Sequence, residues 1–113
     1  MSDCIFCKIA NKEIPSNAVY EDDRILAFRD LSPVAPAHVL IITKEHIDSL
    51  DGLEPQHAEL MGHLMGKVRF IASELGLEKG YRLVSNCGSE GGQTVGHLHF
   101  HLVGGRPMQW PPG

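Results

Sequence analysis

The fold of this chain is decided by residues 93–103, QTVGHLHFHLV, in which three histidines alternate with apolar residues. Side chains of a β-strand point alternately to its two faces. We therefore expect His97, His99 and His101 to share one face of a strand that spans residues 95–103 and to face a cleft. The apolar residues between them would then pack against a helix on the other face.

The rest of the chain predicts one long helix and one short helix. Glu54-Pro55 opens an apolar stripe that ends before Gly76, which is typical of an amphipathic helix of about 20 residues. We expect Met65 to lie on this stripe and His57 and His63 to be exposed to solvent. Residues 4–10 have helical spacing of apolar side chains and predict the short helix.

Four further strands are expected, two of them joined as a hairpin over residues 19–28. The others span residues 38–43 and 81–86. These elements predict a single α+β domain over residues 1–113, with a mainly antiparallel sheet of about five strands covered by the long helix. Because a small sheet leaves edge strands that pairing between subunits would protect, we also expect a homodimer.

The composition argues against several classes of protein. The formal net charge is −4 and the basic residues are scattered, so neither nucleic acid nor a membrane surface is expected as a partner. No stretch approaches the ~18 apolar residues of a membrane span, and the first residues lack the pattern of a secretory signal. We expect a cytoplasmic protein with a small-molecule partner.

The histidine row also predicts chemistry. Histidine titrates near neutrality, attacks through one nitrogen while a hydrogen bond holds the other, and donates a proton when charged. The glycine-rich residues 85–94 beside the row would bring amides and hydroxyls toward an anion. For the histidines, the alternatives are a row of satisfied or solvent-facing side chains and a three-histidine metal site. Three side chains on one straight strand rarely converge on one ion. For residues 85–94, the alternative is an ordinary flexible hairpin loop.

Residues 93–103 resemble the signature of the histidine triad (HIT) superfamily, in which three histidines alternate with apolar residues. Residues 4–15, 27–33, 35–42 and 104–113 extend the resemblance to nearly the whole chain. They are similar to the histidine triad nucleotide-binding (Hint) branch rather than to the branch of dinucleoside polyphosphate hydrolases. The resemblance thus implies a HIT-like fold and a homodimer.

This resemblance implies a purine nucleoside phosphoramidase, which hydrolyses adenosine 5′-monophosphoramidate to AMP and an amine through a nucleotidyl-histidine intermediate. By resemblance, His99 attacks the α-phosphorus, the main-chain carbonyl of His97 orients it, and His101 helps to protonate the leaving amine. His38 supports the active histidine, and Thr94 assists the proton transfer. No cofactor is implied for catalysis.

The resemblance also implies a purine nucleotide site. Asp30 would accept hydrogen bonds from the ribose hydroxyls, and Trp110 would shape the pocket of the other subunit. The purine slot would be formed by Phe6, Ile9, Phe28 and Leu31. The phosphate would be bound by Asn86, Gln93, Thr94, His101 and the main-chain amide of Val95. The alternatives are core packing for Phe28 and Leu31, capping for Asp30, and cover for the core by Trp110.

Cys4-x-x-Cys7 has the spacing of half a tetrahedral zinc site. By resemblance to bacterial members of the superfamily, His46 and His97 complete a structural zinc site. The alternative is a pair of buried thiols on a short helix. Two alternative functions also stay open: dinucleoside polyphosphate cleavage, with which residues 93–95 are also compatible, and purine nucleotide binding without catalysis.

Overall fold

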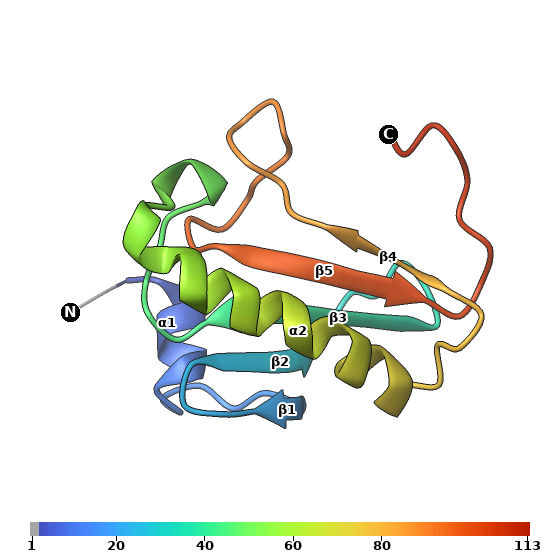
Figure 1. Cartoon of the computed structure of the whole chain (residues 1–113), viewed down its shortest axis with the longest axis horizontal. Helices are drawn as coiled ribbons and strands as arrows, with labels where there is room; N and C mark the ends of the chain where they lie inside the picture. Colours follow the sequence, from blue (N-terminus) through green and yellow to red (C-terminus); the bar gives the residue numbers. More distant parts are fainter. Residues whose placement is uncertain (1–2) are drawn as a thin grey trace.

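The computed structural model describes residues 3–113, which form one five-stranded antiparallel sheet and two α-helices (Figure 1). The strand order is β1-β2-β3-β5-β4, so β3 and β5 are central and β1 and β4 are edges. The elements are α1 (Ile5–Ala10), β1 (Ala18–Glu21), β2 (Ile25–Arg29), β3 (Ala37–Thr43), α2 (Ala58–Glu74), β4 (Tyr81–Val84) and β5 (His99–Gly104). The α+β class and the predicted hairpin are confirmed.

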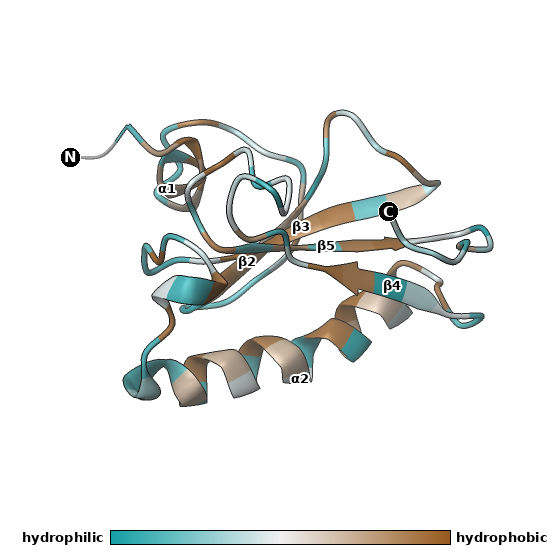
Figure 2. Ribbon diagram, turned by 90° about the horizontal axis from the view of Figure 1, so that it is seen from above, coloured by the Kyte–Doolittle hydropathy of each residue, from teal (hydrophilic) through white to brown (hydrophobic). Residues whose placement is uncertain are grey.

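The sheet has two different faces. Figure 2 shows α2 along one face and α1 on the opposite side. The α2 face holds the larger core, in which Leu64 and Ile71 of the helix pack with Ile41 and Leu102 of the central strands. The other face holds a smaller apolar cluster formed by Phe6, Ile9, Ala10, Leu26, Phe28, Leu40 and Ile42. This smaller cluster leaves room on that face for the histidines of β5.

The long helix differs from its prediction at its N-terminal end. Pro55–His57 form a 3-10 turn, and α2 itself has 17 residues. The expected exposure of His57 is wrong, because its ring is buried and lies 3.0 Å from a carboxylate oxygen of Glu45. His63 is half-buried beside the carboxylate of Asp22, at 2.7 Å. Met65, predicted on the apolar stripe, is 43% exposed.

Strands β4 and β5 are shorter than predicted, because β4 ends at Val84 and β5 begins only at His99. The His97 amide donates to the carbonyl of Val95, and the Leu98 amide donates to the carbonyl of Ile47. The first bond closes a turn and the second joins two loops, so neither belongs to a strand ladder. The prediction that His97 lies on the same strand as the other two histidines and faces a cleft is therefore wrong, and its side chain is 0% exposed.

None of the helices in the described part of the chain, residues 3–113, has the length and hydropathy needed to cross a membrane.

Candidate active site and metal site

The antiparallel pairing of β3 with β5 brings the site together. Ile42 lies opposite His99, so the segment after β3 runs beside the segment before β5. His46 follows β3 and His97 precedes β5, which places both rings at the same end of the sheet, with their centroids 4.9 Å apart. Helix α1 packs at this end through Phe6, whose ring centroid lies 5.1 Å from that of His99.

The two cysteines meet because of the way α1 begins. Cys4 is the N-cap residue of the helix, and its Sγ accepts a hydrogen bond from the main-chain amide of Cys7 at 3.3 Å. An N-cap side chain that bonds to the amide three residues later brings the side chains of these two positions to one end of a helix. The C-x-x-C spacing therefore presents both sulfurs toward His46 and His97.

The four ligand atoms of Cys4, Cys7, His46 and His97 all lie within 4.8 Å of one another. The Nδ1 atom of His97 is 3.3 Å from the Cys4 Sγ and 3.6 Å from the Cys7 Sγ. The Nδ1 atom of His46 is 3.1 Å from the Cys7 Sγ. Ordinary Zn–S and Zn–N bonds place sulfur and nitrogen ligands about 3.5 Å apart around one ion. These separations fit a tetrahedral zinc site.

The hydrogen bonds of the two imidazoles also suit a metal ion. The Nε2 atom of His97 lies 2.8 Å from the carbonyl oxygen of Thr43, which only accepts, so Nε2 carries the hydrogen and the Nδ1 lone pair faces the sulfurs. The Nε2 atom of His46 lies 2.8 Å from a carboxylate oxygen of Asp48, with the same consequence. A carboxylate or carbonyl behind a ligating histidine is the usual arrangement at zinc sites.

Burial, together with the nearby His46 and His99, lowers the pKa of His97. A neutral ring is the form that binds metal.

His99 is held by its neighbour's main chain. Its Nδ1 atom lies 2.6 Å from the carbonyl oxygen of His97, and its side chain is buried. Since the carbonyl accepts, Nδ1 is the protonated nitrogen and Nε2 of the neutral ring keeps its lone pair. His99 therefore has the form of a nitrogen nucleophile. Ser85 donates its hydroxyl hydrogen to the His99 carbonyl at 2.8 Å and ties β5 to the end of β4.

His101, His38 and Asp30 form a second cluster on the same face of the sheet. The Nδ1 atom of His101 is 2.9 Å from the Nε2 atom of His38. The Val34 amide donates to the Nδ1 atom of His38 at 3.1 Å, so the hydrogen of the neutral His38 ring is on Nε2 and points at His101. A neutral His101 ring then carries its own hydrogen on Nε2. Asp30 lies beside the pair, 3.4 Å from the Nε2 atom of His38.

The second cluster resembles a metal site by composition, because its ligand atoms also lie within 4.8 Å of one another. It does not fit one. A metal would need the lone pair of His38 Nε2, which would put the hydrogen of that ring on Nδ1, against the N–H of Val34. Burial first, and then His99 and His38, lower the pKa of His101, while Asp30 opposes this shift. The arrangement is a chain of hydrogen bonds that ends at the Nε2 atom of His101.

The other predicted site residues lie in different surroundings. Phe6, Ile9 and Phe28 belong to the smaller core cluster, whereas Leu31 is 97% exposed and Trp110 is 82% exposed. Thr94 is exposed, and Asn86 and Val95 are half-buried beside the glycine-rich loop.

Gln93 has its polar atoms occupied. Its Nε2 atom donates to the carbonyls of Asp48 and Val95, at 2.8 Å and 3.0 Å, and its Oε1 atom accepts from the Gly88 amide. A direct phosphate contact would have to replace one of these bonds. Asp48 was not among the predicted site residues. Its position two residues after a ligand histidine is the only hint in the sequence, because its contacts with His46 and Gln93 depend on loop geometry.

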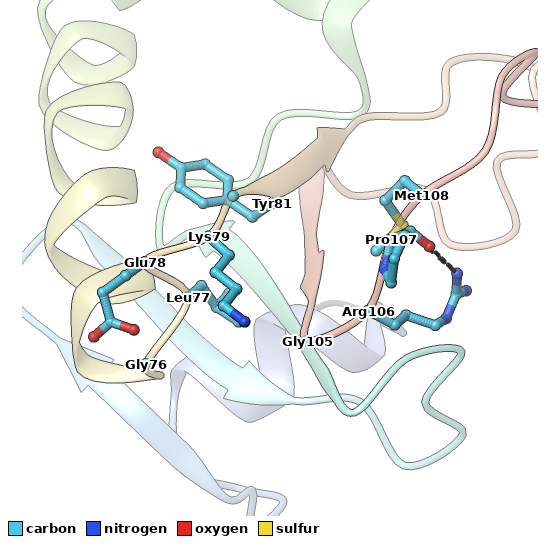
Figure 3. A pocket seen from close by; sticks show the side chains of 10 residues that line it. Gly76, Leu77, Glu78, Lys79, Tyr81, Gly105, Arg106, Pro107 and Met108 are labelled. Carbon is cyan, nitrogen blue, oxygen red and sulfur yellow. Dashed lines mark hydrogen bonds between the residues drawn. The ribbon is translucent and has the colours of Figure 1, made fainter.

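A hollow of about 720 Å³ shares no lining residue with either cluster, and Figure 3 shows the side chains that line it. It is bounded by the turn between α2 and β4 and by the segment after β5, with Tyr81, Arg106 and Met108 in its walls. Tyr81 pairs with Gly104 at the far end of β5, whereas His99 begins that strand. The hollow therefore contributes no residue to the histidine site.

The fold and the two clusters define a small α+β protein in which the buried His99 and the half-buried His101 lie beside a Cys2His2 metal-ligand cluster. The chain belongs to the HIT domain family, which matches residues 11–108. Its fold is that of the HIT family hydrolases. A HIT family hydrolase from Legionella pneumophila superposes with a TM-score of 0.96 at 51% identity, covering 98% of this chain and 100% of that one.

Two relatives are similar over nearly their full length. An uncharacterized HIT-like protein of Synechococcus elongatus is 54% identical, and the match covers 98% of this chain and 97% of that protein. A 14 kDa zinc-binding protein of Brassica juncea is 50% identical, and the match covers 98% of this chain and 100% of that protein. Together with the Cys/His cluster, the second relative is consistent with a structural zinc ion in this chain.

Proposed function

We propose that this protein is a purine nucleoside phosphoramidase that cleaves the P–N bond of adenosine 5′-monophosphoramidate and related compounds. The observation that carries the proposal is the 2.6 Å contact between the Nδ1 atom of His99 and the His97 carbonyl, which leaves Nε2 as the nucleophile. Membership of a family that typically binds nucleotides supports a nucleotide as the substrate.

In the first step the Nε2 lone pair of His99 forms a bond to the α-phosphorus, and the P–N bond to the leaving group breaks. The departing nitrogen keeps the electron pair of that bond and takes a proton that the Thr94 hydroxyl passes on from solvent, while the Nε2 hydrogen of the neutral His101 ring donates to a phosphate oxygen. The hydrogen bonds from Val34 to His38 and from His38 to His101 orient this hydrogen. Covalent catalysis of this kind divides one displacement into two easier ones.

In the second step a water molecule attacks the phosphorus and passes its proton through the Thr94 hydroxyl back to solvent. The bond between the phosphorus and His99 breaks, its electron pair returns to Nε2, and AMP leaves. Thr94, Asn86 and the main-chain amide of Val95 stabilise the phosphate oxygens in both steps. Asp30 accepts hydrogen bonds from the ribose. The zinc site holds the protein around His97 and takes no part in either step.

We also propose a homodimer in which Trp110 of one subunit reaches the nucleotide site of the other. Two features support it: β4 is an edge strand that pairs only with β5 among the described strands, and the Trp110 side chain is 82% exposed. An edge strand offers unpaired main-chain groups to a second chain. Light scattering on the purified protein measures the oligomeric state.

The test compares the parent protein with His99→Asn and follows AMP release from an adenosine phosphoramidate and from a diadenosine polyphosphate. We expect phosphoramidate cleavage by the parent and a loss of at least about 100-fold in the variant, because removal of a covalent nucleophile generally costs that much. His63→Asn, on α2 and outside both clusters, is the matched control and should keep the parent rate.

Two results would overturn the proposal. Preferential cleavage of the diadenosine polyphosphate by the parent would make the protein a different hydrolase. Binding of AMP without turnover of either substrate would make it a nucleotide-binding protein.

A further inference from the structure

The short segment 46–48 connects the metal-ligand cluster with the loop that precedes β5. Its first residue, His46, is a ligand of the cluster. The carbonyl of Ile47 accepts from the Leu98 amide at 2.6 Å, and the Ile47 side chain is buried in the larger core. Asp48 contacts both the metal-ligand cluster and the loop: its carboxylate lies beside His46, and its main-chain carbonyl accepts from Gln93.

Gln93 is the partner of this segment on the loop side. Its two amide hydrogens bind the carbonyls of Asp48 and Val95, and its Oε1 atom accepts from the Gly88 amide at 3.0 Å. The Gln93 main-chain amide also donates to the Gly88 carbonyl at 3.0 Å. One side chain therefore closes the loop from residue 88 to 95 and attaches it to residue 48. Four of the residues in this loop are glycine or serine, so little else in its sequence restricts it.

We infer that Asp48 and Gln93 are positioning residues that couple the metal site to the phosphate-binding loop, so that a zinc ion and a nucleotide bind cooperatively. The nucleotide part of this inference rests on the proposed function. A metal ion that binds His46 also restrains the main chain of Asp48, two residues later. Because Gln93 donates to the Asp48 carbonyl, the loop is restrained as well, and its conformational entropy is lower before a nucleotide binds. A ligand that binds an already ordered loop avoids part of the entropy cost of ordering it.

Such coupling is reciprocal, and this makes it measurable. If zinc raises the affinity for AMP by some factor, AMP must raise the affinity for zinc by the same factor. We expect a factor on the order of fivefold to tenfold, at the lower end of the usual range for coupled sites. Calorimetry measures AMP binding to the zinc-loaded and the chelator-treated protein. Competition with a chromophoric chelator measures zinc affinity with and without AMP.

Two substitutions separate the parts of the connection. Gln93→Leu removes the link to Asp48 but no metal ligand, so zinc affinity in the absence of AMP should stay while the coupling factor falls to about one. Asp48→Ala removes the carboxylate behind His46 but keeps the carbonyl that Gln93 binds. It should lower zinc affinity about 10- to 100-fold, the usual effect of removing such a partner, and leave the coupling factor in place. Gln56→Leu, at an exposed glutamine in the 3-10 turn before α2, is the matched control.

Hydrogen exchange tests the connection without any nucleotide. Zinc should slow the exchange of the Gly92 and Gln93 amides, both of which donate hydrogen bonds within the loop, and this effect should disappear in Gln93→Leu. Equal AMP affinity with and without zinc in the parent would overturn the coupling. Absence of AMP binding in both states would overturn the proposed function instead, and the exchange experiment would then decide the link between metal and loop. Unchanged exchange on addition of zinc would overturn that link.

Discussion

The protein gathers two clusters of metal-ligating side chains on the same side of its sheet, and only one of them has lone pairs that converge. In the cluster around Cys4 and Cys7, His46 and His97 donate their Nε2 hydrogens outward and turn Nδ1 inward. In the cluster around His101, a hydrogen lies between the two rings, because Val34 fixes the tautomer of His38. A single hydrogen bond to the remote nitrogen of a histidine thus decides whether the ring serves a metal or a proton.

The difference has a functional consequence for the histidine row. His97 and His101 both flank His99, yet each is held by a different cluster. His97 has a side chain that belongs to the metal site and a carbonyl that orients His99. His101 belongs to the hydrogen-bond chain. Three residues that look equivalent in the sequence therefore occupy three separate environments.

Removal of a metal ligand should have the largest effect, because it should change both the zinc content and the free energy of unfolding. In Cys7→Ser, a hydroxyl replaces the thiolate, and we expect the loss of stoichiometric zinc. With free zinc about a thousandfold above its dissociation constant, the bound ion adds about 4 kcal/mol to the free energy of unfolding. Elemental analysis and thermal unfolding measure both effects. Cys87→Ser, outside both clusters, is the control, and one tightly bound zinc per chain in Cys7→Ser would contradict the assignment.

A change in pH should act on the hydrogen-bond chain with a smaller effect. Burial lowers the pKa of His101, with His99 and His38 adding to the shift and Asp30 opposing it. Below about pH 6.5, His101 takes up a proton in the unfolded chain but not yet in the folded protein. The free energy of unfolding is therefore highest above this pH, and it falls as the pH falls from about 6.5 through the pKa of His101 in the folded protein. Between pH 7.5 and 5, the free energy of unfolding of His101→Gln should therefore fall less than that of the parent.

Urea unfolding at each pH measures this difference, and zinc content is checked in both proteins at every pH. Parallel pH profiles for the parent and His101→Gln would contradict the neutral hydrogen-bond chain.

The smallest expected effect is the response to excess zinc. Because His38 keeps its hydrogen on Nε2, the cluster of Asp30, His38 and His101 should bind no second ion tightly. A calorimetric titration of the chelator-treated protein with zinc should give one tight site per chain. A second tight site that Asp30→Asn abolishes would show that both clusters bind metal, and the distinction between them would fail.

Much of the fold could be predicted from local patterns. The hairpin of β1 and β2, the central strand β3 and the amphipathic stripe of α2 follow from alternation and helical spacing. The start of β5 could not be predicted in this way, because the alternation of histidines continues through His97 although the ladder does not. The hydrogen bond that the Leu98 amide donates to the Ile47 carbonyl ends the strand pattern there, and a contact between loops leaves no local signal.

The sequence by itself determined which residues carry the chemistry: the histidine row, the C-x-x-C pair and the resemblance that supplied His46 as a further ligand. Only the tertiary structure decided which of these histidines belong to the metal-ligand cluster and which to the hydrogen-bond chain, because the tautomer of each ring depends on partners such as Thr43, Asp48 and Val34. These partners are main-chain groups or loop side chains whose positions follow from the pairing of β3 with β5. Alternation along a strand determines the side on which a ring lies, whereas the hydrogen bond at its far nitrogen determines what that ring does.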